Sequence, residues 1–207
     1  GVQARLQTPG ARVLAQRDID AEFTSVFVAN GASGLRPFTS ADQLVELKGR
    51  RLAFGSESST SGRLMPQFFM GENGMKPEDL AGGGPGFSGS HDATIAVVQS
   101  GAYEAGALNE QVWRSNMANG RVDPGKVSVI WRTPPYVDYH WVVRPGLDDR
   151  FGDGFTDKLQ SALLDLSADT ENGATILELF GAERFIPAKD EDYVMIETVG
   201  RQLGKIR

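Results

Sequence analysis

The stretch Phe54-Gly-Ser-Glu-Ser-Ser-Thr-Ser-Gly-Arg-Leu-Met-Pro66 decides the fold that we expect for this chain. The run at residues 51–54, which leads into it, is typical of a short buried strand. An apolar series at helical spacing follows: Leu64, Met65, Phe68 and Phe69. A strand, a small polar loop and a helix start predict a cradle for an anion, because the first N–H groups of a helix have no partner inside it and carry the positive end of its dipole.

The hydroxyl groups of Ser59, Thr60 and Ser61 are expected to bind a tetrahedral oxyanion together with those N–H groups. The alternative is that Ser59 or Ser61 only caps the helix. A cap needs one hydroxyl and this loop offers five, which favours binding. The loop is not a nucleotide-binding P-loop, since it has no Gly-Lys-Ser or Gly-Lys-Thr. No Lys or Arg lies between Gly55 and Gly62, so neutral dipoles would hold the anion, which suits reversible capture better than bond cleavage.

The composition is that of a globular protein that does not bind nucleic acid. The 207 residues are enough for one large domain or two small lobes, and 40% hydrophobic residues support a core. The net charge of −6 and the pI of about 5.0 argue against a nucleic-acid partner. There is no apolar run of about 18 residues, and therefore no predicted membrane span. The absence of cysteine fits an oxidising compartment or the cytosol and decides nothing.

The Ser-Thr-Ser-Gly run after a strand ending in Phe-Gly resembles the phosphonate/phosphite substrate-binding proteins of bacterial ABC importers. Residues 87–93 (Phe-Ser-Gly-Ser-His-Asp-Ala) and 129–135 (Val-Ile-Trp-Arg-Thr-Pro-Pro) resemble the same family in order and spacing. The resemblance covers nearly the whole chain and is closest to a branch usually labelled selenate-binding. It implies an α/β fold of the type II periplasmic-binding-protein kind, with two lobes and a ligand cleft between them. It also implies a binding protein rather than an enzyme, with no cofactor and no metal.

The family fold implies a division of the chain into three parts. Residues 1–30 are expected in lobe 1, residues 31–135 in lobe 2, and residues 136–207 in the return crossover and the C-terminal helices of lobe 1. No signal peptide is visible and Gly1 is not an initiator Met. Family members carry an N-terminal part before this point, so we expect an incomplete first lobe.

The resemblance also implies where the protein works and with what. It predicts a periplasmic protein, or one anchored by lipid outside the cytoplasmic membrane, whose partners are a small oxyanion and an ABC permease. The ligand would be phosphonate, phosphite or a similar anion, with selenate as a further candidate. An anion that bridges both lobes would shift the population toward a closed state, which the permease would recognise.

Three more residues complete the expected ligand site: His91, Glu110 and Asp138. His91 stands at a motif position that faces the cleft in the family, although a lone His near a helix start is more often structural. Glu110 follows a strand expected at residues 103–108, at the end where ligands of open α/β sheets gather, and it falls where aminophosphonate binders hold an amine. Asp138 aligns with a second family acid; the alternative is a solvated loop carboxylate.

The two acids also bear on the choice of ligand. Two like charges about 4 Å apart at an effective dielectric constant near 20 repel by about 4 kcal/mol, and a dianion would add to this repulsion. A ligand ammonium or an acidic ligand proton would offset it, and fully ionised selenate has neither. Glu110 and Asp138 therefore favour an (amino)phosphonate or a protonated oxyanion over selenate.

Two other classes of protein compete with this interpretation. A regulatory effector domain of the LysR type has the same lobed fold and binds small anions. A hydrolase would use Ser61, His91 and Asp92 as a triad. Against the hydrolase, residues 55–59 lack the closing Gly of a nucleophile elbow, and adjacent positions such as 91 and 92 point apart on a helix.

The rest of the chain predicts alternating strands and helices. The β-branched and aromatic run at residues 23–29 predicts a strand in the first crossover, with Phe23 in the core rather than in contact with the ligand. Other strands are expected at residues 12–17 and 127–131, and helices near residues 92–98, 111–119, 155–166, 174–179 and 190–203. Alternation in the middle of the chain predicts parallel strands.

Overall fold

A computed structural model describes residues 1–206 of the chain. By its internal contacts the chain divides into two compact units. Unit 1 comprises residues 1–23 and the chain from Pro135 onward, and unit 2 comprises Thr24–Pro134. The chain therefore passes between the units only twice, at Phe23–Thr24 and at Pro134–Pro135.

Unit 2 is built on a mixed five-stranded sheet in the order β4-β3-β5-β2-β6. The strands are β2 (Ser25–Asn30), β3 (Leu52–Phe54), β4 (Gly86–Phe87), β5 (Ala105–Asn109) and β6 (Val127–Arg132). Strands β3, β4 and β5 are parallel, as the alternation of elements predicted. The parallel prediction is wrong for β2, which runs antiparallel to β5 and β6, because the chain enters along β2 and leaves along β6 at the same edge of the sheet.

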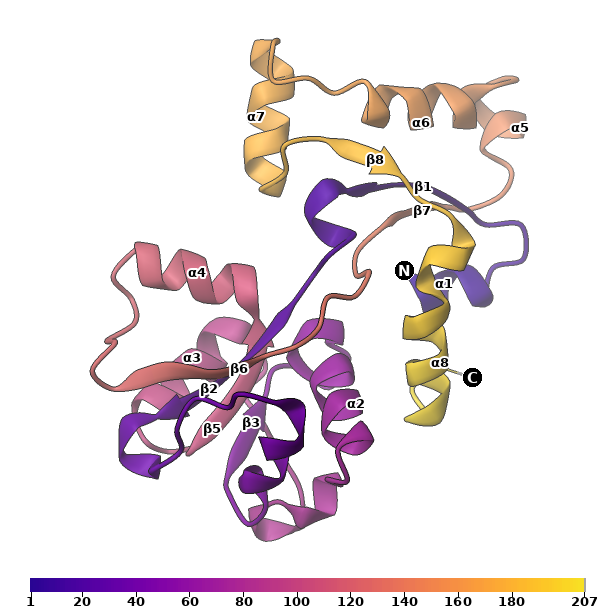
Figure 1. The fold of residues 1–207 in the computed structure, drawn as a ribbon. Coiled ribbons are helices and arrows are strands. Elements are labelled where there is room, and N and C mark those ends of the chain that lie inside the picture. The colour runs from indigo at the N-terminus through magenta and orange to yellow at the C-terminus, as the bar shows by residue number, and fades with distance from the viewer. Residues whose placement is uncertain (207) are drawn as a thin grey trace. The chain divides into compact units, whose positions relative to one another are not determined.

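Helices cover both faces of this sheet, with α3 (His91–Gln99) and α4 (Glu110–Ala118) on one face and α2 (Met65–Glu72) on the other (Figure 1). The alternation of side chains along β2 explains the two layers. Val26 and Val28 share a buried core with residues of α3 and α4. Phe27, between them, packs against Trp131, which contacts Phe69 of α2.

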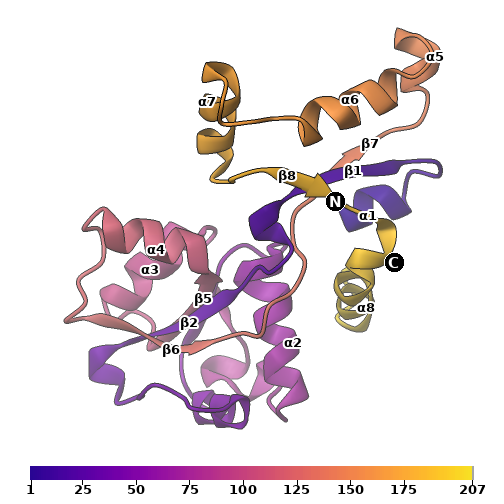
Figure 2. The same ribbon diagram turned by 45° about the horizontal axis from the view of Figure 1, so that its top comes forward.

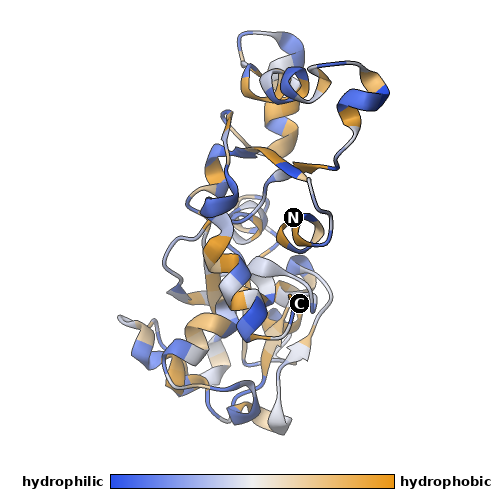
Figure 3. Cartoon of the chain, turned by 90° about the vertical axis from the view of Figure 1, so that its right-hand side faces the viewer, coloured by the Kyte–Doolittle hydropathy of each residue, from blue (hydrophilic) through white to orange (hydrophobic). Residues whose placement is uncertain are grey.

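Unit 1 has an antiparallel three-stranded sheet in the order β7-β1-β8 (Figure 2). Its strands are β1 (Arg12–Arg17), β7 (Trp141–Val143) and β8 (Phe185–Pro187). Its helices are α1 (Val2–Leu6), α5 (Leu147–Phe151), α6 (Phe155–Leu164), α7 (Glu171–Phe180) and α8 (Val194–Gln202). Leu14 and Ala15 of β1 form a core with Leu177 and Phe185. Hydrophobic and hydrophilic residues alternate around the helices, as surface helices require (Figure 3).

Most expected elements are present, and one expected boundary differs. The strand at residues 12–17 is confirmed with the predicted bounds, and Phe23 is buried at 2% exposure, as expected of a core residue. The first lobe segment was expected to end at residue 30, whereas the contacts place all of β2 in unit 2. The reason is that β2 pairs along both edges with strands of that unit.

None of the helices in residues 1–206 has the length and apolar character needed to cross a bilayer.

Unit 1 contains a buried polar group around His140. The Tyr193 hydroxyl donates to Gln16 Oε1 at 2.9 Å, and both residues are buried. The His140 and Tyr193 rings lie 3.8 Å apart between centroids, and His140 Nδ1 is 3.4 Å from the Asp138 carbonyl oxygen. Burial lowers the pKa of His140 to about 4, although its contact with that carbonyl acts in the opposite direction.

We expect acidification to destabilise the protein through His140. An unfolded histidine protonates near pH 6.5, whereas the folded pKa of His140 is about 4. The unfolded chain thus binds the proton more readily, so this contribution to stability is complete above about pH 6.5 and is lost as the pH falls toward about 4. His140→Phe keeps a ring against Tyr193 and removes the titration. Its melting temperature should therefore fall less than that of the wild type between about pH 7 and about pH 4.5; parallel pH profiles would contradict the assignment.

Candidate functional site

The residues that the sequence predicts for the site in unit 2 follow the carboxyl ends of its parallel strands, where open α/β sheets bind ligands. The loop with Ser59, Thr60 and Ser61 follows β3, His91 follows β4, and Glu110 follows β5. The first two loops are joined by backbone hydrogen bonds. The Ser88 N–H donates to the Phe54 carbonyl at 2.9 Å, and the Gly89 N–H donates to the Gly55 carbonyl at 3.2 Å.

The helix after β3 begins with a wide turn of π type at Thr60–Leu64. The Leu64 N–H donates to the Ser59 carbonyl at 3.0 Å, and the Ser59 hydroxyl caps the turn by accepting the Gly62 N–H at 2.9 Å. Ser59 is thus a cap, but a hydroxyl that accepts an N–H still has its own proton to donate. The N–H groups of Thr60 and Ser61 donate to no acceptor within residues 1–206, as expected at a helix start.

Ser61 is fully buried, and its hydroxyl is unsatisfied. Its carbonyl accepts the Ser25 hydroxyl at 2.7 Å, but its own Oγ makes no hydrogen bond to any residue that the structure describes. A buried polar group left without a partner costs roughly 1–3 kcal/mol. A ligand oxygen placed against Ser61 would recover that free energy.

His91 is held as a neutral donor. It begins α3, and its Nδ1 accepts the backbone N–H of Asn109 at 3.3 Å. Because Nδ1 accepts a hydrogen bond, the proton of the neutral ring is on Nε2, which can donate to an anion. Burial lowers the pKa of His91, and the opposing effect of the Asp92 charge is smaller, so the ring stays neutral near pH 7.

The hydrolase alternative fails on the geometry of its three residues. The Asp92 carboxylate accepts a hydrogen bond from Asn116 Nδ2 at 2.9 Å, and His91 Nδ1 is bonded to the backbone, not to a carboxylate. The Ser61 hydroxyl makes no hydrogen bond to His91 in the described chain. A triad needs a carboxylate that orients the imidazole and an imidazole that takes the serine proton, and neither contact is made.

Glu110 lies in an ion cluster, with only 3% of its surface exposed. Its Oε1 accepts hydrogen bonds from Arg114 at 2.9 and 2.7 Å and from Arg132 Nε at 2.7 Å, and its Oε2 accepts the Thr24 hydroxyl. Burial raises the pKa of Glu110, but the hydrogen bonds from Thr24, Arg114 and Arg132 outweigh it, and the pKa lies below its ordinary value.

The sequence analysis missed the partners of Glu110. Arg114 carries a local signal, because it stands four residues after Glu110 on a helix, at the spacing of an intrahelical ion pair. Thr24 and Arg132 carry no local signal. They reach Glu110 because β2 begins and β6 ends at the edge where β5 ends.

Asp138 belongs to unit 1, where it is buried and not the solvated loop carboxylate of the alternative. Its backbone N–H donates to the Asp20 carbonyl at 3.0 Å, and its own carbonyl faces His140.

No group of three His, Cys, Asp or Glu side chains in residues 1–206 is placed to hold a metal ion.

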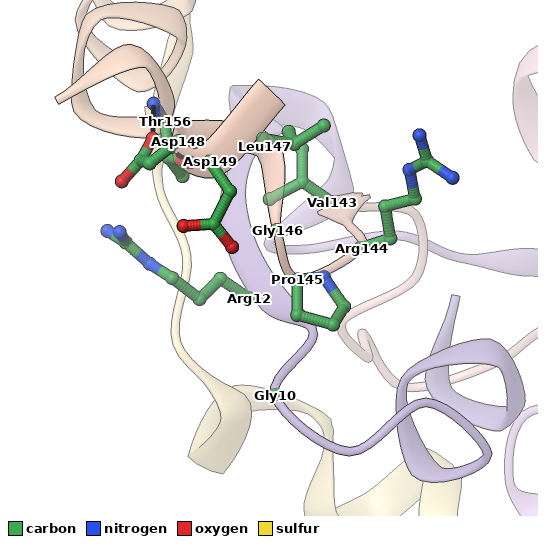
Figure 4. A pocket seen from close by; sticks show the side chains of 10 residues that line it. All are labelled: Gly10, Arg12, Val143, Arg144, Pro145, Gly146, Leu147, Asp148, Asp149 and Thr156. Carbon is green, nitrogen blue, oxygen red and sulfur yellow. Dashed lines mark hydrogen bonds between the residues drawn. The ribbon is translucent and has the colours of Figure 1, made fainter. Parts of the chain in front are cut away.

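Unit 1 also has a hollow of about 260 Å³ beside β7 and α5 (Figure 4). Two arginines and two aspartates line it, so their charges compensate. The carboxylate of Asp149 points toward Arg12, whereas Arg144 points away (Figure 4). Asp148 accepts hydrogen bonds from the Thr156 N–H and hydroxyl at 2.7 and 2.8 Å, and Arg12 pairs with Asp157 at 3.1 Å. Arg12 and Asp148 of this hollow are therefore already engaged by Asp157 and Thr156.

Comparison with known proteins identifies close relatives. The family described as "ABC transporter, phosphonate, periplasmic substrate-binding protein" matches residues 1–193. A probable ABC transporter phosphite binding protein, PhnD1 of Prochlorococcus marinus (strain MIT 9301), is 51% identical over all 207 residues, which span 70% of its length. The structure of PhnD1 in complex with methylphosphonate superposes with a TM-score of 0.94 over 100% of this chain and 76% of that one.

A more distant match concerns the fold alone. A binding protein component of an ABC phosphonate transporter from Pseudomonas aeruginosa is 20% identical, with a TM-score of 0.68 over 94% of this chain and 61% of its own. The predicted type II periplasmic-binding-protein fold is confirmed by these structural neighbours. The relatives are substrate-binding proteins and not enzymes, whereas selenate and the LysR-type alternative find no support among them.

Gly62→Ala should disrupt the loop after β3. A Cβ at this position would lie 2.9 Å from both His91 Cε1 and Ser59 Oγ, so the ring and the capping hydroxyl must move. We expect anion binding to weaken by at least about tenfold, or about 1.4 kcal/mol, in calorimetric titrations. The matched control is Gly71→Ala in α2, where an added Cβ meets no atom within 4 Å. Equal affinities in the two variants would count against the site.

Proposed function

Because this chain belongs to the family of periplasmic substrate-binding proteins of phosphonate ABC transporters, we propose that it captures phosphite or a small phosphonate at the helix start after β3. The relative PhnD1 is described as a probable phosphite binding protein, and its structure holds methylphosphonate. We extend that ligand class to this chain. The proposed contacts are the residues predicted from the sequence in this loop, Ser59, Thr60 and Ser61, together with His91.

The observation that carries the proposal is the buried, unsatisfied hydroxyl of Ser61 beside two unused backbone N–H groups. The Ser61 hydroxyl has given up water without gaining a partner in the described chain, and the two N–H groups make no hydrogen bond there. A tetrahedral anion has several oxygens within a small volume and can accept hydrogen bonds from all of them. Hydrogen bonds to charged groups contribute roughly 1.5–3 kcal/mol each, so three or four of them account for tight binding.

The site relies on neutral donors. Arg63 is the cation nearest in sequence, but its guanidinium donates to the Glu57 carbonyl at 3.0 Å and lies 4.6 Å from the Phe87 ring centroid. The neutral His91 contributes a dipole and no charge. Neutral dipoles can attract an anion without forming an ion pair with it. An ion pair would slow the release of the anion, so this kind of binding suits a protein that must deliver its ligand.

Delivery requires a change of state that the permease can recognise. Two connections alone join the two units, so a hinge at those connections is the simplest motion that this topology allows. We propose that Asp138 of unit 1 takes part in the closed state, and that the ligand stabilises this state by binding it more tightly than the open one. The membrane partner is the ABC permease of the same importer.

Replacing Ser59, Thr60 and Ser61 together by Ala tests the proposed site. The change removes three hydroxyl donors and the helix cap, and we expect binding of methylphosphonate and phosphite to weaken by several kcal/mol, which is more than about 100-fold. Isothermal titration calorimetry measures the affinity, and circular dichroism shows whether the variant is folded.

The control for this experiment is Ser128→Ala, an exposed hydroxyl on β6, which should bind like the wild type. If the folded triple variant keeps the wild-type affinity, the serine-threonine-serine run serves only to cap the helix, and the proposed site is wrong.

A further inference from the structure

Glu110 lies next to the proposed site without belonging to it. Two members of its cluster are sequence neighbours of residues that support the proposed site. Glu110 follows Asn109, whose N–H holds His91 at 3.3 Å. Thr24 precedes Ser25, whose hydroxyl donates to the Ser61 carbonyl at 2.7 Å. Glu110 and Thr24 are therefore each one residue away from a group that is hydrogen-bonded to a residue of the proposed site.

Both carboxylate oxygens of Glu110 already accept hydrogen bonds within the protein. Oε1 accepts three hydrogen bonds, two from Arg114 and one from Arg132, and Oε2 accepts one from Thr24. The side chain of Glu110 is 4% exposed, whereas those of Arg114 and Arg132 are 72% and 51% exposed. The negative charge is thus shielded, and solvent meets the two guanidinium groups.

The cluster carries a net positive charge, because two guanidinium groups surround one carboxylate and the sum is 2 − 1 = +1. An ammonium group placed here would meet two cations and a carboxylate that is already paired with both of them. An uncharged substituent would meet no such repulsion.

We propose that Glu110 determines ligand specificity indirectly: its pairing with Arg114 and Arg132 makes the site select phosphorus oxyanions whose fourth substituent is uncharged and reject aminophosphonates. The inference rests on the proposed function and narrows its ligand class. It assigns Glu110 a positioning role. The alternative that the test must exclude is the role expected from the family resemblance, in which Glu110 contacts a ligand amine.

The test compares methylphosphonate with 2-aminoethylphosphonate by calorimetry on the full chain. The wild type should bind methylphosphonate at least about 100-fold more tightly. The double variant Arg114→Gln/Arg132→Gln leaves Glu110 charged and largely unpaired, and should reduce this ratio at least about tenfold. The double variant Arg121→Gln/Lys126→Gln removes the same charge from exposed positions of unit 2 and should leave the ratio unchanged.

Glu110→Gln separates the two roles. If Glu110 is a positioning residue, this variant still prefers methylphosphonate, because the two arginines remain. A wild type that prefers 2-aminoethylphosphonate, together with a Glu110→Gln variant that loses this preference, would overturn the inference and leave the proposed function intact. An unchanged ratio in the arginine double variant would also overturn it. No binding of either phosphonate by the wild type would overturn the proposed function and the inference together.

Discussion

The wide first turn of the helix after β3 is the constraint on which the proposed site of unit 2 depends. A π-type turn places two N–H groups and the hydroxyls of Ser59, Thr60 and Ser61 at the carboxyl edge of the sheet. The turn persists because Ser59 caps it and because Gly62 has no side chain where the His91 ring approaches. The ring is in turn fixed by a backbone N–H of β5. Three neighbouring strands thus cooperate to hold a few uncharged donors together.

The formal charges around this loop are all engaged elsewhere. Arg63 bonds to Glu57 and packs on Phe87, and the Glu110 carboxylate is enclosed by two arginines. Because of this pairing, the loop can attract an anion only through its dipoles. The cluster of Glu110 with its two arginines adds a moderate positive potential nearby. An anion would be drawn to the site by this potential and held by hydrogen bonds of defined direction. Discrimination between anions then depends on the position of their oxygens and, by the inference drawn for Glu110, on the charge of the fourth substituent.

The sequence was sufficient to predict the family, the order of elements and the helix start, because these depend on local patterns. The strand at residues 12–17 and the sequence of strand, polar loop and helix at residues 52–72 are examples. The partners of Glu110 could not be predicted from the sequence, because strand pairing brings Thr24 and Arg132 to it from 86 and 22 residues away. The end of the first lobe segment was misplaced for the same reason. Whether a crossing strand belongs to the unit it leaves or the unit it enters depends on its sheet partners, which local composition does not reveal.

The edge that carries the proposed site is also the edge through which the chain enters and leaves unit 2. Ser25 makes this plain, since its hydroxyl donates to the Ser61 carbonyl while its N–H donates to the Thr133 hydroxyl. The connection at Phe23–Thr24 therefore lies within two residues of Ser25, which is bonded to the loop, and the connection at Pro134–Pro135 lies within two residues of Thr133, which is bonded to Ser25. These hydrogen bonds form a contiguous network between the proposed binding loop and the two connecting segments, and networks of this kind can carry coupling between sites. The same few residues shape the proposed site and join it to both connecting segments, so under the proposed hinge motion a substitution at this edge should change ligand affinity and the open–closed equilibrium together.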